Sequence, residues 1–367
     1  MTQEKINCEK IQRLLLAWFA NNQRNLPWRE AYNPYEIWIS EIMGQQTQLG
    51  RVSDYFSRWI AQFPDIASLA AAPERSVMKA WEGLGYYSRA RNIQRTAAIL
   101  VRDYHAQVPD SMTKLLSLPG IGQYTAAAIL SIGFNQPVPL VDANVERLFA
   151  RLGDIECPIK SKEGKTQVHA LAAQLLDKAS PRIFNQALME LGALVCTPKK
   201  PSCSHCPLSA DCLARQRDTI SIRPVLQPRP ERLDIAMSCG IIFQEGLVYI
   251  QQRLPNDIWG GLWEFPGGRM EEGETPAEGA MREILEETGW QAEIEIPFDT
   301  VTHHYTRYRV TLHSFVCSLS TDAHLVPPVL EAASRYAWVR KDELSSYPFP
   351  AGHKQLVKNL LKKELFR

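Results

Sequence analysis

The chain has 367 residues, which is long enough for two domains, and its hydrophobic content of 45% is enough for ordinary cores. No apolar run is long enough to span a membrane, which argues against an integral membrane protein. Segment 1–10 is polar and charged and lacks the apolar core of a signal peptide. We therefore expect a cytoplasmic protein with no membrane partner.

The net charge of +1 conceals a difference between the two parts of the chain. Residues 1–225 carry 26 Lys and Arg against 20 Asp and Glu, a balance of +6. Residues 226–367 carry 15 against 20, a balance of −5. The positive excess of the first part fits a polyanionic partner, although it is modest for 225 residues.

The first part is predicted to be all-α. Apolar residues recur at helical spacing in segments 6–23, 34–59, 66–69, 73–81, 88–104, 112–116, 125–132, 144–152, 165–176 and 182–195. The alternation of apolar and polar residues that is typical of strands does not appear before about residue 235.

The second part is predicted to be α/β and to follow a linker. Segment 217–232 contains Pro224, Pro228 and Pro230 with several arginines, which predicts an extended connection. Beyond it, the pattern predicts strands at 235–243, 247–253, 308–319 and 335–339, and helices at 275–288 and 352–365.

A Pro-Gly-Ile-Gly turn at 119–122 separates two of the predicted helices. Gly120 and Gly122 permit the positive φ of a tight turn, and the free N–H groups of the next helix would face an anionic oxygen there. Twenty residues later, Asp142 follows an apolar run broken by prolines. Taken alone, these features are most often a helix connector and a helix N-cap.

Clustered cysteines are the sharpest signal in the first part. Cys196, Cys203, Cys206 and Cys212 follow one another with spacers of six, two and five residues. In a cytoplasmic chain this cluster indicates metal binding rather than disulfides. Four thiolates suit either tetrahedral zinc or a [4Fe–4S] cluster, and the spacing alone excludes neither.

Glu41 lies beside the large apolar residues Trp38, Ile42 and Met43. A helical glutamate usually faces solvent. If it is instead buried, desolvation raises its pKa, and a neutral acid could protonate a leaving base. Asp142 would then be the second, ionised carboxylate, as the cleavage of glycosidic bonds generally requires.

Segments 39–43, 45–48, 83–92, 118–124, 141–147 and 184–192 resemble those of the MutY-type adenine DNA glycosylases. The cysteine spacing is similar to that of the [4Fe–4S] cluster in this family and in endonuclease III. The resemblance implies a glycosylase region over 1–216. Residues 24–133 would form a six-helix lobe with a helix–hairpin–helix, and residues 1–23 with 134–216 would form the iron–sulfur lobe.

The resemblance also implies the chemistry, which is removal of adenine mispaired with 8-oxoguanine or guanine after the base is flipped into a pocket. Glu41 would protonate adenine at N7. Asp142, supported by Asn144, would stabilise the oxocarbenium-like sugar, and Tyr124 would stand near that sugar. Related bifunctional enzymes have a lysine at position 124, and a phenol cannot form their Schiff base. We therefore expect hydrolysis without strand cleavage, that is, a monofunctional enzyme.

The matches further imply residues that bind double-stranded DNA. Trp28, Arg29 and Gln186 would line the adenine pocket, and Gln46 and Tyr86 would wedge into the duplex beside the lesion. Gly120 and Gly122 would hold a phosphate through hairpin amides. Without the surrounding motifs, aromatic packing would be the ordinary interpretation of Trp28 and Tyr86.

In the second part, segment 268–290 matches the Nudix box, with Trp290 where a smaller aliphatic residue is usual. Glu283, Glu286 and Glu287 fall on one helical face, where their repulsion would be relieved by Mg²⁺ bridging to a diphosphate. A solvated acidic helix is the alternative, which the flanking glycines at fixed spacing make the weaker one.

Segment 259–268 resembles MutT, which hydrolyses 8-oxo-dGTP. MutY proteins carry such a domain to recognise 8-oxoguanine in DNA, which is the role implied for residues 233–367, with Thr306 reaching the lesion. Gly352 stands where MutT has an asparagine that grips the oxidised base. The charged positions of the box are intact, whereas the nucleotide-selecting residue is missing, so we expect recognition with weak or absent hydrolysis.

The sequence thus predicts a monomeric, nucleoid-associated adenine DNA glycosylase of base excision repair. Two hypotheses from other classes compete with it. One is a nucleotide pyrophosphohydrolase, which depends on the Nudix box. The other is a non-catalytic binder of damaged DNA, against which Glu41 and Asp142 argue, because a binder needs neither. Release of adenine from a duplex would discriminate the three.

Overall fold

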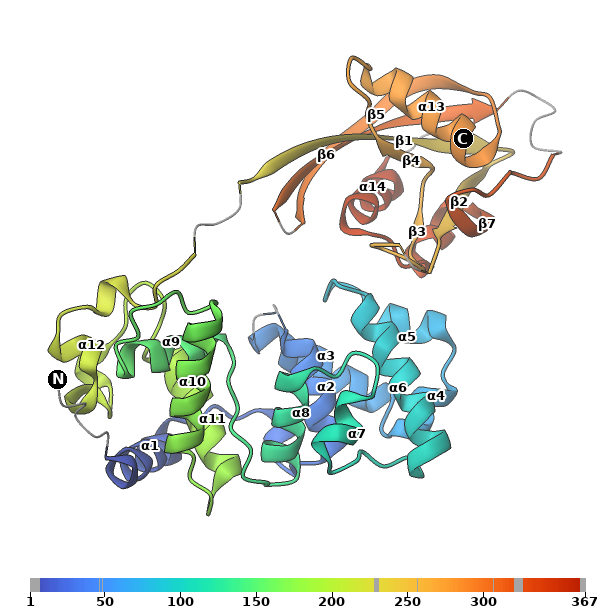
Figure 1. Ribbon diagram of the computed structural model, residues 1–367. Coiled ribbons are helices and arrows are strands. Elements are labelled where there is room, and N and C mark those ends of the chain that lie inside the picture. Colours follow the sequence, from blue (N-terminus) through green and yellow to red (C-terminus); the bar gives the residue numbers. More distant parts are fainter. Residues whose placement is uncertain are drawn as a thin grey trace. The chain divides into compact units, whose positions relative to one another are not determined.

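The computed structural model describes residues 7–45, 47, 49–227, 231–255, 257–305, 307–319 and 326–363. The predictions for Gln46 and Thr306 therefore lie outside the described residues. The chain divides into two compact units (Figure 1). One unit holds residues 1–72 and 92–228, and the other holds 73–91 and 229–367.

In the described part of residues 7–227, every regular secondary-structure element is a helix. The helices are α1 (Cys8–Asn22), α2 (Pro34–Gly44), α3 (Leu49–Gln62), α4 (Ile66–Ala71), α5 (Glu74–Ala80), α6 (Ser88–Tyr104), α7 (Met112–Leu116), α8 (Gln123–Ala128), α9 (Ala143–Leu152), α10 (Lys162–Leu175), α11 (Pro181–Leu194) and α12 (Leu213–Gln216). Short 3-10 segments are η1 (Pro27–Arg29), η3 (Cys203–His205), η4 (Ser209–Asp211) and η5 (Ile220–Ile222). A π-helical turn, η2 (Ile129–Gly133), continues α8.

One helix prediction is wrong in its extent. The apolar pattern over 34–59 predicts a single helix, but α2 ends at Gly44 and α3 begins at Leu49. Gln45 has extended backbone angles, φ −61° and ψ 112°. Gly44 has a low helix propensity and favours an end at this point, while apolar residues on both sides keep the helical period.

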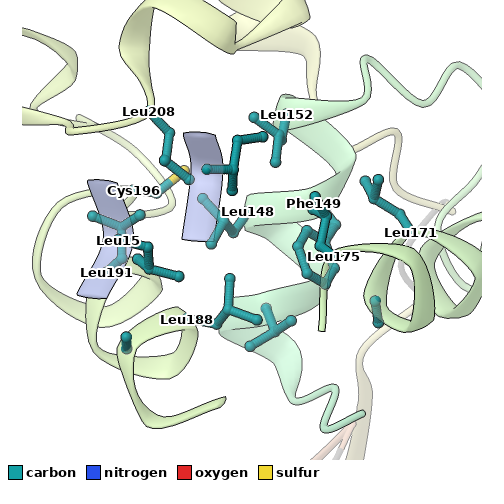
Figure 2. Close-up of a cluster of buried hydrophobic side chains, with 14 of the residues drawn as sticks. Leu15, Leu148, Phe149, Leu152, Leu171, Leu175, Leu188, Leu191, Cys196 and Leu208 are labelled. Carbon is teal, nitrogen blue, oxygen red and sulfur yellow. The ribbon is translucent and has the colours of Figure 1, made fainter. Parts of the chain in front are cut away.

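The core of the first unit joins α1 to helices more than a hundred residues later. Leu15 of α1 packs with Leu148 and Phe149 of α9, Leu175 of α10 and Leu191 of α11, all of them buried (Figure 2). Each of these helices is apolar along one stripe, so burying the stripes against one another is what brings α1 to this group. Cys196 and Leu208 lie at the edge of the same core.

The predicted linker is extended only in part. Arg223 is 7% exposed, and its Nε donates to Asp154 Oδ1 at 2.8 Å. The N–H of Ile159 donates to the carbonyl of Val225 at 3.0 Å. Because a buried arginine needs a partner, the Asp154 pair holds the segment around Arg223 against the helical unit.

The second unit is built on a seven-stranded mixed sheet in the order β3-β2-β1-β6-β5, with β4 paired to β1 and β7 to β2. Its strands are β1 (Leu233–Gln244), β2 (Leu247–Arg253), β3 (Trp263–Glu264), β4 (Gly267–Arg269), β5 (Ala292–Tyr305), β6 (Tyr308–Leu319) and β7 (Ala333–Arg340). Strands β1 and β6 are parallel, and the other pairs are antiparallel. The fold-class prediction of an all-α region plus a C-terminal α/β domain is confirmed.

Helices α13 (Pro276–Thr288) and α14 (Ala351–Lys362) cover opposite faces of this sheet (Figure 1). Alternate residues of β1 enter the two cores, Ile241 with Leu356 of α14 and Ile242 with Ile284 of α13. The alternation follows from the period of two along a strand. A 3-10 segment, η7 (Lys341–Ser346), precedes α14.

The sequence prediction missed β3, β4 and β5. Strand β5 contains Pro297 and pairs with β6 through two register shifts, one between Ile294 and Ile296 and one between Pro297 and Asp299. Such irregularities interrupt the strict alternation by which a strand is identified in sequence. Strands β3 and β4 are too short to show a period. Among the described residues, no helix has the length and apolar character needed to cross a membrane.

Candidate active site

A cleft in the first unit encloses about 800 Å³, a volume typical of ligand sites. It brings together side chains from η1, α2, α8, α9 and α11. Every residue predicted for catalysis lines it, and so do the three predicted for the adenine pocket: Glu41, Asp142, Tyr124, Asn144, Trp28, Arg29 and Gln186.

Glu41 projects into the cleft from the last turn of α2, whose start is set by the N-cap Asn33 and by Pro34. Its Oε2 accepts a hydrogen bond of 2.5 Å from the hydroxyl of Tyr124 on α8. Burial raises the pKa of Glu41 to about 7, against the lowering effect of the Tyr124 hydrogen bond. The charge of Asp142 adds to the rise, and Arg29 opposes it. A carboxyl in this state is a suitable general acid near neutral pH.

Asp142 is the N-cap of α9. Its surroundings favour a charged carboxylate more than the surroundings of Glu41 do. Burial raises its pKa. Against this, Oδ1 accepts from the N–H of Val145 at 2.7 Å, and Oδ2 accepts from the side-chain amide of Asn144 at 2.9 Å. Hydrogen bonds to a carboxylate favour ionisation, and so does a helix N-terminus. The cleft therefore holds one acid with a pKa raised to about 7 and a second, buried carboxyl group whose hydrogen bonds favour its charged form.

Arg147, which the sequence prediction did not single out, holds Asn144 in turn. Its Nη2 donates to Asn144 Oδ1 at 2.9 Å and to the carbonyl of Gly192 at 2.7 Å, while its Nε donates to the carbonyl of Cys196 at 2.7 Å. A Cβ at Gly192 would lie 2.8 Å from that of Asn144, so only glycine lets α11 approach α9 here. The side chain of Asn144 is thus oriented from behind the cleft.

A buried carboxylate on the opposite wall was also missed. Glu190 is 1% exposed and accepts from Arg24 Nε at 2.7 Å and from Arg29 Nη2 at 3.1 Å. Burial acts to raise its pKa, but the hydrogen bonds and charges of the two arginines lower it overall. Glu190 stands four residues after Gln186 on α11, so helical spacing could have placed both on the cleft-facing side.

Trp28 and Gln186 form part of the apolar and polar walls of the same cleft. Trp28 is 6% exposed and packs edge-on against Phe56, with ring centroids 5.1 Å apart. Gln186 is 2% exposed. Their burial leaves one defined face of each side chain towards the cavity.

In the hairpin between α7 and α8, only one of the two glycines has the positive φ of a tight turn, because Gly122 has a φ of −94°. Gly120 has a φ of +77°, and a Cβ there would lie 2.7 Å from that of Asn92. Thr96 Oγ1 donates to the carbonyl of Pro119 at 2.8 Å and fixes the turn to α6. Gly122 is the N-cap of α8 and supplies no side chain, so the first N–H groups of α8 remain accessible.

Tyr86, the remaining described residue of the predicted DNA-binding set, belongs to the second compact unit. Its φ is +48° and its side chain is 39% exposed, with the Arg89 guanidinium 5.6 Å from the ring centroid. An exposed tyrosine on a strained loop is consistent with a wedging side chain.

The four clustered cysteines, Cys196, Cys203, Cys206 and Cys212, line one small cavity. Burial, with the other three thiols nearby, raises the pKa of Cys206 to about 11. Among the described residues, no three His, Cys, Asp or Glu side chains come close enough together to hold a single metal ion.

In the Nudix box, Arg282 relieves the repulsion for which the sequence prediction invoked a metal. Its Nε donates to Glu274 at 2.6 Å, and its Nη1 donates to Glu283 at 3.0 Å and to Glu286 at 2.9 Å. Glu287 is instead turned inward. It accepts from Gln251 at 2.8 Å and from the N–H of Gly267 at 2.9 Å, and burial, with the charge of Glu264, raises its pKa to about 8.

A side chain at position 352, such as the asparagine of MutT, would require the His303 ring to shift. A Cβ on Gly352 would lie 2.9 Å from Cε1 of His303 and 3.3 Å from Cδ2 of Leu312. His303 thus fills the space beside the first turn of α14.

The comparisons with known proteins agree with this architecture. The family model described as HhH-GPD superfamily base excision DNA repair protein matches residues 39–178, and the NUDIX domain model matches residues 238–359. An adenine DNA glycosylase of Buchnera aphidicola (subspecies Schizaphis graminum) is 34% identical over 70% of this chain and 74% of its own length. The chain belongs to the adenine DNA glycosylase family.

Other members of the family match a smaller share of their own length. The adenine DNA glycosylases of Mus musculus and Homo sapiens are 36% and 43% identical over 74% and 55% of this chain. The chain spans 63% of the mouse protein and 39% of the human one. A solved complex of endonuclease III with DNA is 25% identical with a TM-score of 0.50, covering 58% of this chain and 99% of that one.

The ion pair between Glu190 and Arg29 leads to a prediction about the pKa of Glu41. Glu190→Gln leaves the charge of Arg29 uncompensated, which favours the Glu41 carboxylate, so the pKa of Glu41 should fall below its present value of about 7. A pH titration of the carboxyl ¹³C resonance of Glu41 measures the change. Glu163→Gln on α10, away from the cleft, is the matched control and should leave the pKa of Glu41 unchanged. An unchanged or raised pKa in Glu190→Gln would contradict the electrostatic role.

Proposed function

We propose that the protein is a monofunctional DNA glycosylase that hydrolyses the N-glycosidic bond of adenine mispaired with 8-oxoguanine or guanine. The observation that carries the proposal is the pair of carboxyl groups in one cleft. Glu41 has a pKa raised to about 7, and Asp142 accepts hydrogen bonds that favour its charge. A protonated acid with an ionised carboxylate is what cleavage of a glycosidic bond through a cationic sugar needs. Membership of the adenine DNA glycosylase family supports adenine as the base.

In this mechanism Glu41 gives its proton to adenine N7, and the bond between N9 and the sugar C1′ breaks with its electron pair moving to the base. Asp142 stabilises the positive charge that develops on the sugar. Water then adds to C1′, and the proton it loses returns to Glu41. Tyr124 holds the Glu41 carboxyl in place through its hydroxyl and has no amine to attack the sugar.

Binding of double-stranded DNA is the second part of the proposal. The accessible N–H groups at Gly122 would hold a phosphate near the cleft, and Trp28 and Gln186 would contact the flipped adenine. On the family resemblance, we propose that Gln46 and Tyr86 contact the duplex beside the lesion. Thr306 would contact 8-oxoguanine. The glycosylase region is assigned to 1–216 and the recognition domain to 233–367.

The decisive experiment is base release from a duplex with adenine opposite 8-oxoguanine. Wild-type protein should leave an abasic strand that breaks only after alkali. Glu41→Gln should slow release by roughly two to four orders of magnitude, because the general acid is lost, while duplex binding stays near the wild-type level. Glu36→Gln, on the same helix but outside the cleft, should release adenine normally. Near-normal turnover by Glu41→Gln would refute the assignment, and efficient borohydride trapping of wild type would refute monofunctionality.

We further propose that Cys196, Cys203, Cys206 and Cys212 hold a [4Fe–4S] cluster. The residues fit the group, because four thiols, the ligands that an iron–sulfur cluster takes, line one cavity. The family resemblance of the cysteine spacing supports a [4Fe–4S] cluster over zinc, since four thiolates suit either. Arg151 donates to Cys196 Sγ at 3.3 Å and to the carbonyl of Thr197 at 2.8 Å, so the loop is also held by the protein. The cluster would be structural.

Metal analysis tests this proposal. Purified protein should be yellow-brown and contain about four iron and four sulfide per chain. Cys203→Ser should lose the colour and lower the thermal midpoint, whereas Cys157→Ser, outside the cavity, should keep both. Stoichiometric zinc without sulfide would show the metal assignment to be wrong.

For the Nudix domain we propose recognition of the lesion with weak or absent nucleotide hydrolysis. Glu287, protonated and hydrogen-bonded to Gln251 and Gly267, is poorly placed to share a metal with Glu283 and Glu286, which pair with Arg282. Gly352 itself has no side chain with which to grip a base, and His303 lies beside it. The rival hydrolase needs Mg²⁺ at these three glutamates.

Incubating the full chain with 8-oxo-dGTP and Mg²⁺ tests the rival activity. We expect hydrolysis at the background rate, with Glu287→Gln giving the same trace as wild type. Fast hydrolysis that Glu287→Gln abolishes would instead make the protein an enzyme with two activities.

A further inference from the structure

The side-chain amide of Gln186 is held in one orientation by two acceptors. Its Nε2 donates to the carbonyl of Arg182 at 3.2 Å and to the hydroxyl of Tyr32 at 3.4 Å. A carbonyl only accepts hydrogen bonds, so the nitrogen of the amide must face it. The two N–H groups are then both engaged, and the oxygen Oε1 is the atom that remains for the cleft that Gln186 lines.

Tyr32 is itself fixed by its surroundings. The Arg182 guanidinium lies over its ring, 4.4 Å from the centroid. The same guanidinium donates from Nε to the carbonyl of Ile132 at 2.6 Å and from Nη2 to that of Gly133 at 2.8 Å, which anchors it to the π-helical turn η2. Tyr32 also has a φ of +52°, which a tyrosine adopts only where the structure requires it. The ring is therefore clamped between the N-terminal turn of α11 and its own loop.

This orientation of the Gln186 amide is complementary to the edge of adenine. Adenine presents the N7 acceptor and the N6 amino donor side by side, whereas guanine presents N7 and the O6 acceptor. The cleft offers Glu41 as a donor when it is protonated and Gln186 Oε1 as an acceptor. The pair matches adenine, while O6 of guanine or hypoxanthine would face another acceptor. If the amide turned over, this preference would be reversed.

We propose that Tyr32, with the Arg182 carbonyl, is a specificity-determining positioning residue that locks the Gln186 amide with its acceptor towards the 6-amino group of the flipped adenine. The inference deepens the proposed glycosylase activity and rests on it. No contact between Tyr32 and the base is involved, because Tyr32 acts through Gln186.

The test compares Tyr32→Phe with wild type on duplexes that carry adenine or unsubstituted purine opposite 8-oxoguanine. Purine lacks the 6-amino group but keeps N7. Loss of one neutral hydrogen bond should slow single-turnover release of adenine by roughly three- to tenfold. Release of purine should change by less than about twofold, since purine has no 6-amino group for Oε1 to bind. A merely structural role would slow both bases equally, which would overturn the inference, and so would an unchanged rate for adenine.

A second variant and a control guard against misfolding. Tyr32→Asn also removes the hydroxyl, and asparagine tolerates a positive φ, so it should reproduce the adenine-specific loss. Tyr104→Phe at the end of α6, outside the cleft, should leave both rates at wild-type values. If wild-type protein released no adenine, the proposed function would fail and take this inference with it. If it released adenine but the adenine-to-purine ratio stayed constant in both Tyr32 variants, only the inference would fail.

Discussion

The hydrogen bond from Tyr124 to Glu41 ties α2 to the helix that follows the hairpin, and the chemistry of the cleft depends on it. The two helices come from segments about eighty residues apart, and this hydrogen bond joins their side chains in the cavity. Burial keeps the Glu41 carboxyl largely protonated near neutral pH. The phenol keeps that acid in one place without competing for its proton, because burial raises the pKa of Tyr124 well above its ordinary value. A mobile glutamate with the same pKa would lose the orientation that proton transfer requires.

Two carboxyl groups lie in this cleft, and their different positions on the backbone favour different protonation states. Glu41 sits at the end of a helix among apolar neighbours, whereas Asp142 begins one and receives the N–H of Val145. Asn144 adds a second donor, and Arg147 orients Asn144 from behind. Since Arg147 also donates to the carbonyl of Cys196, the carboxylate end of the site is braced by the cysteine loop. The candidate catalytic cleft and the cysteine loop are therefore joined through Arg147.

The second unit shows how charged residues can be retained while their chemistry changes. Arg282 forms ion pairs with Glu274, Glu283 and Glu286, and Glu287 faces the interior. Gly268 is needed for the same arrangement, since a Cβ there would lie 2.4 Å from the Glu283 carboxylate. The box thus supports its own fold through internal pairing, and His303 closes the position beside Gly352. A domain built in this way keeps the shape of a Nudix fold without a metal ion between these glutamates.

Local patterns in the sequence were sufficient for the helices, the linker region, the cysteine cluster and the candidate carboxylates, because helical spacing, prolines and clustered ligands act over short stretches of chain. The same patterns could not reveal the break at Gly44, since the apolar period continues through it, nor β5, whose bulges disturb the alternation. Residues such as Glu190, Arg147 and Tyr32 escaped notice because each acts only through a partner distant in sequence: Glu190 through Arg24 and Arg29, Arg147 through Cys196, and Tyr32 through Gln186. The sequence by itself determined which chemical groups are present and on which elements they lie. Only the tertiary structure decided which of them are buried, and so which carboxyl holds its proton and which way an amide points, because desolvation and hydrogen bonding depend on what the rest of the chain places around each group.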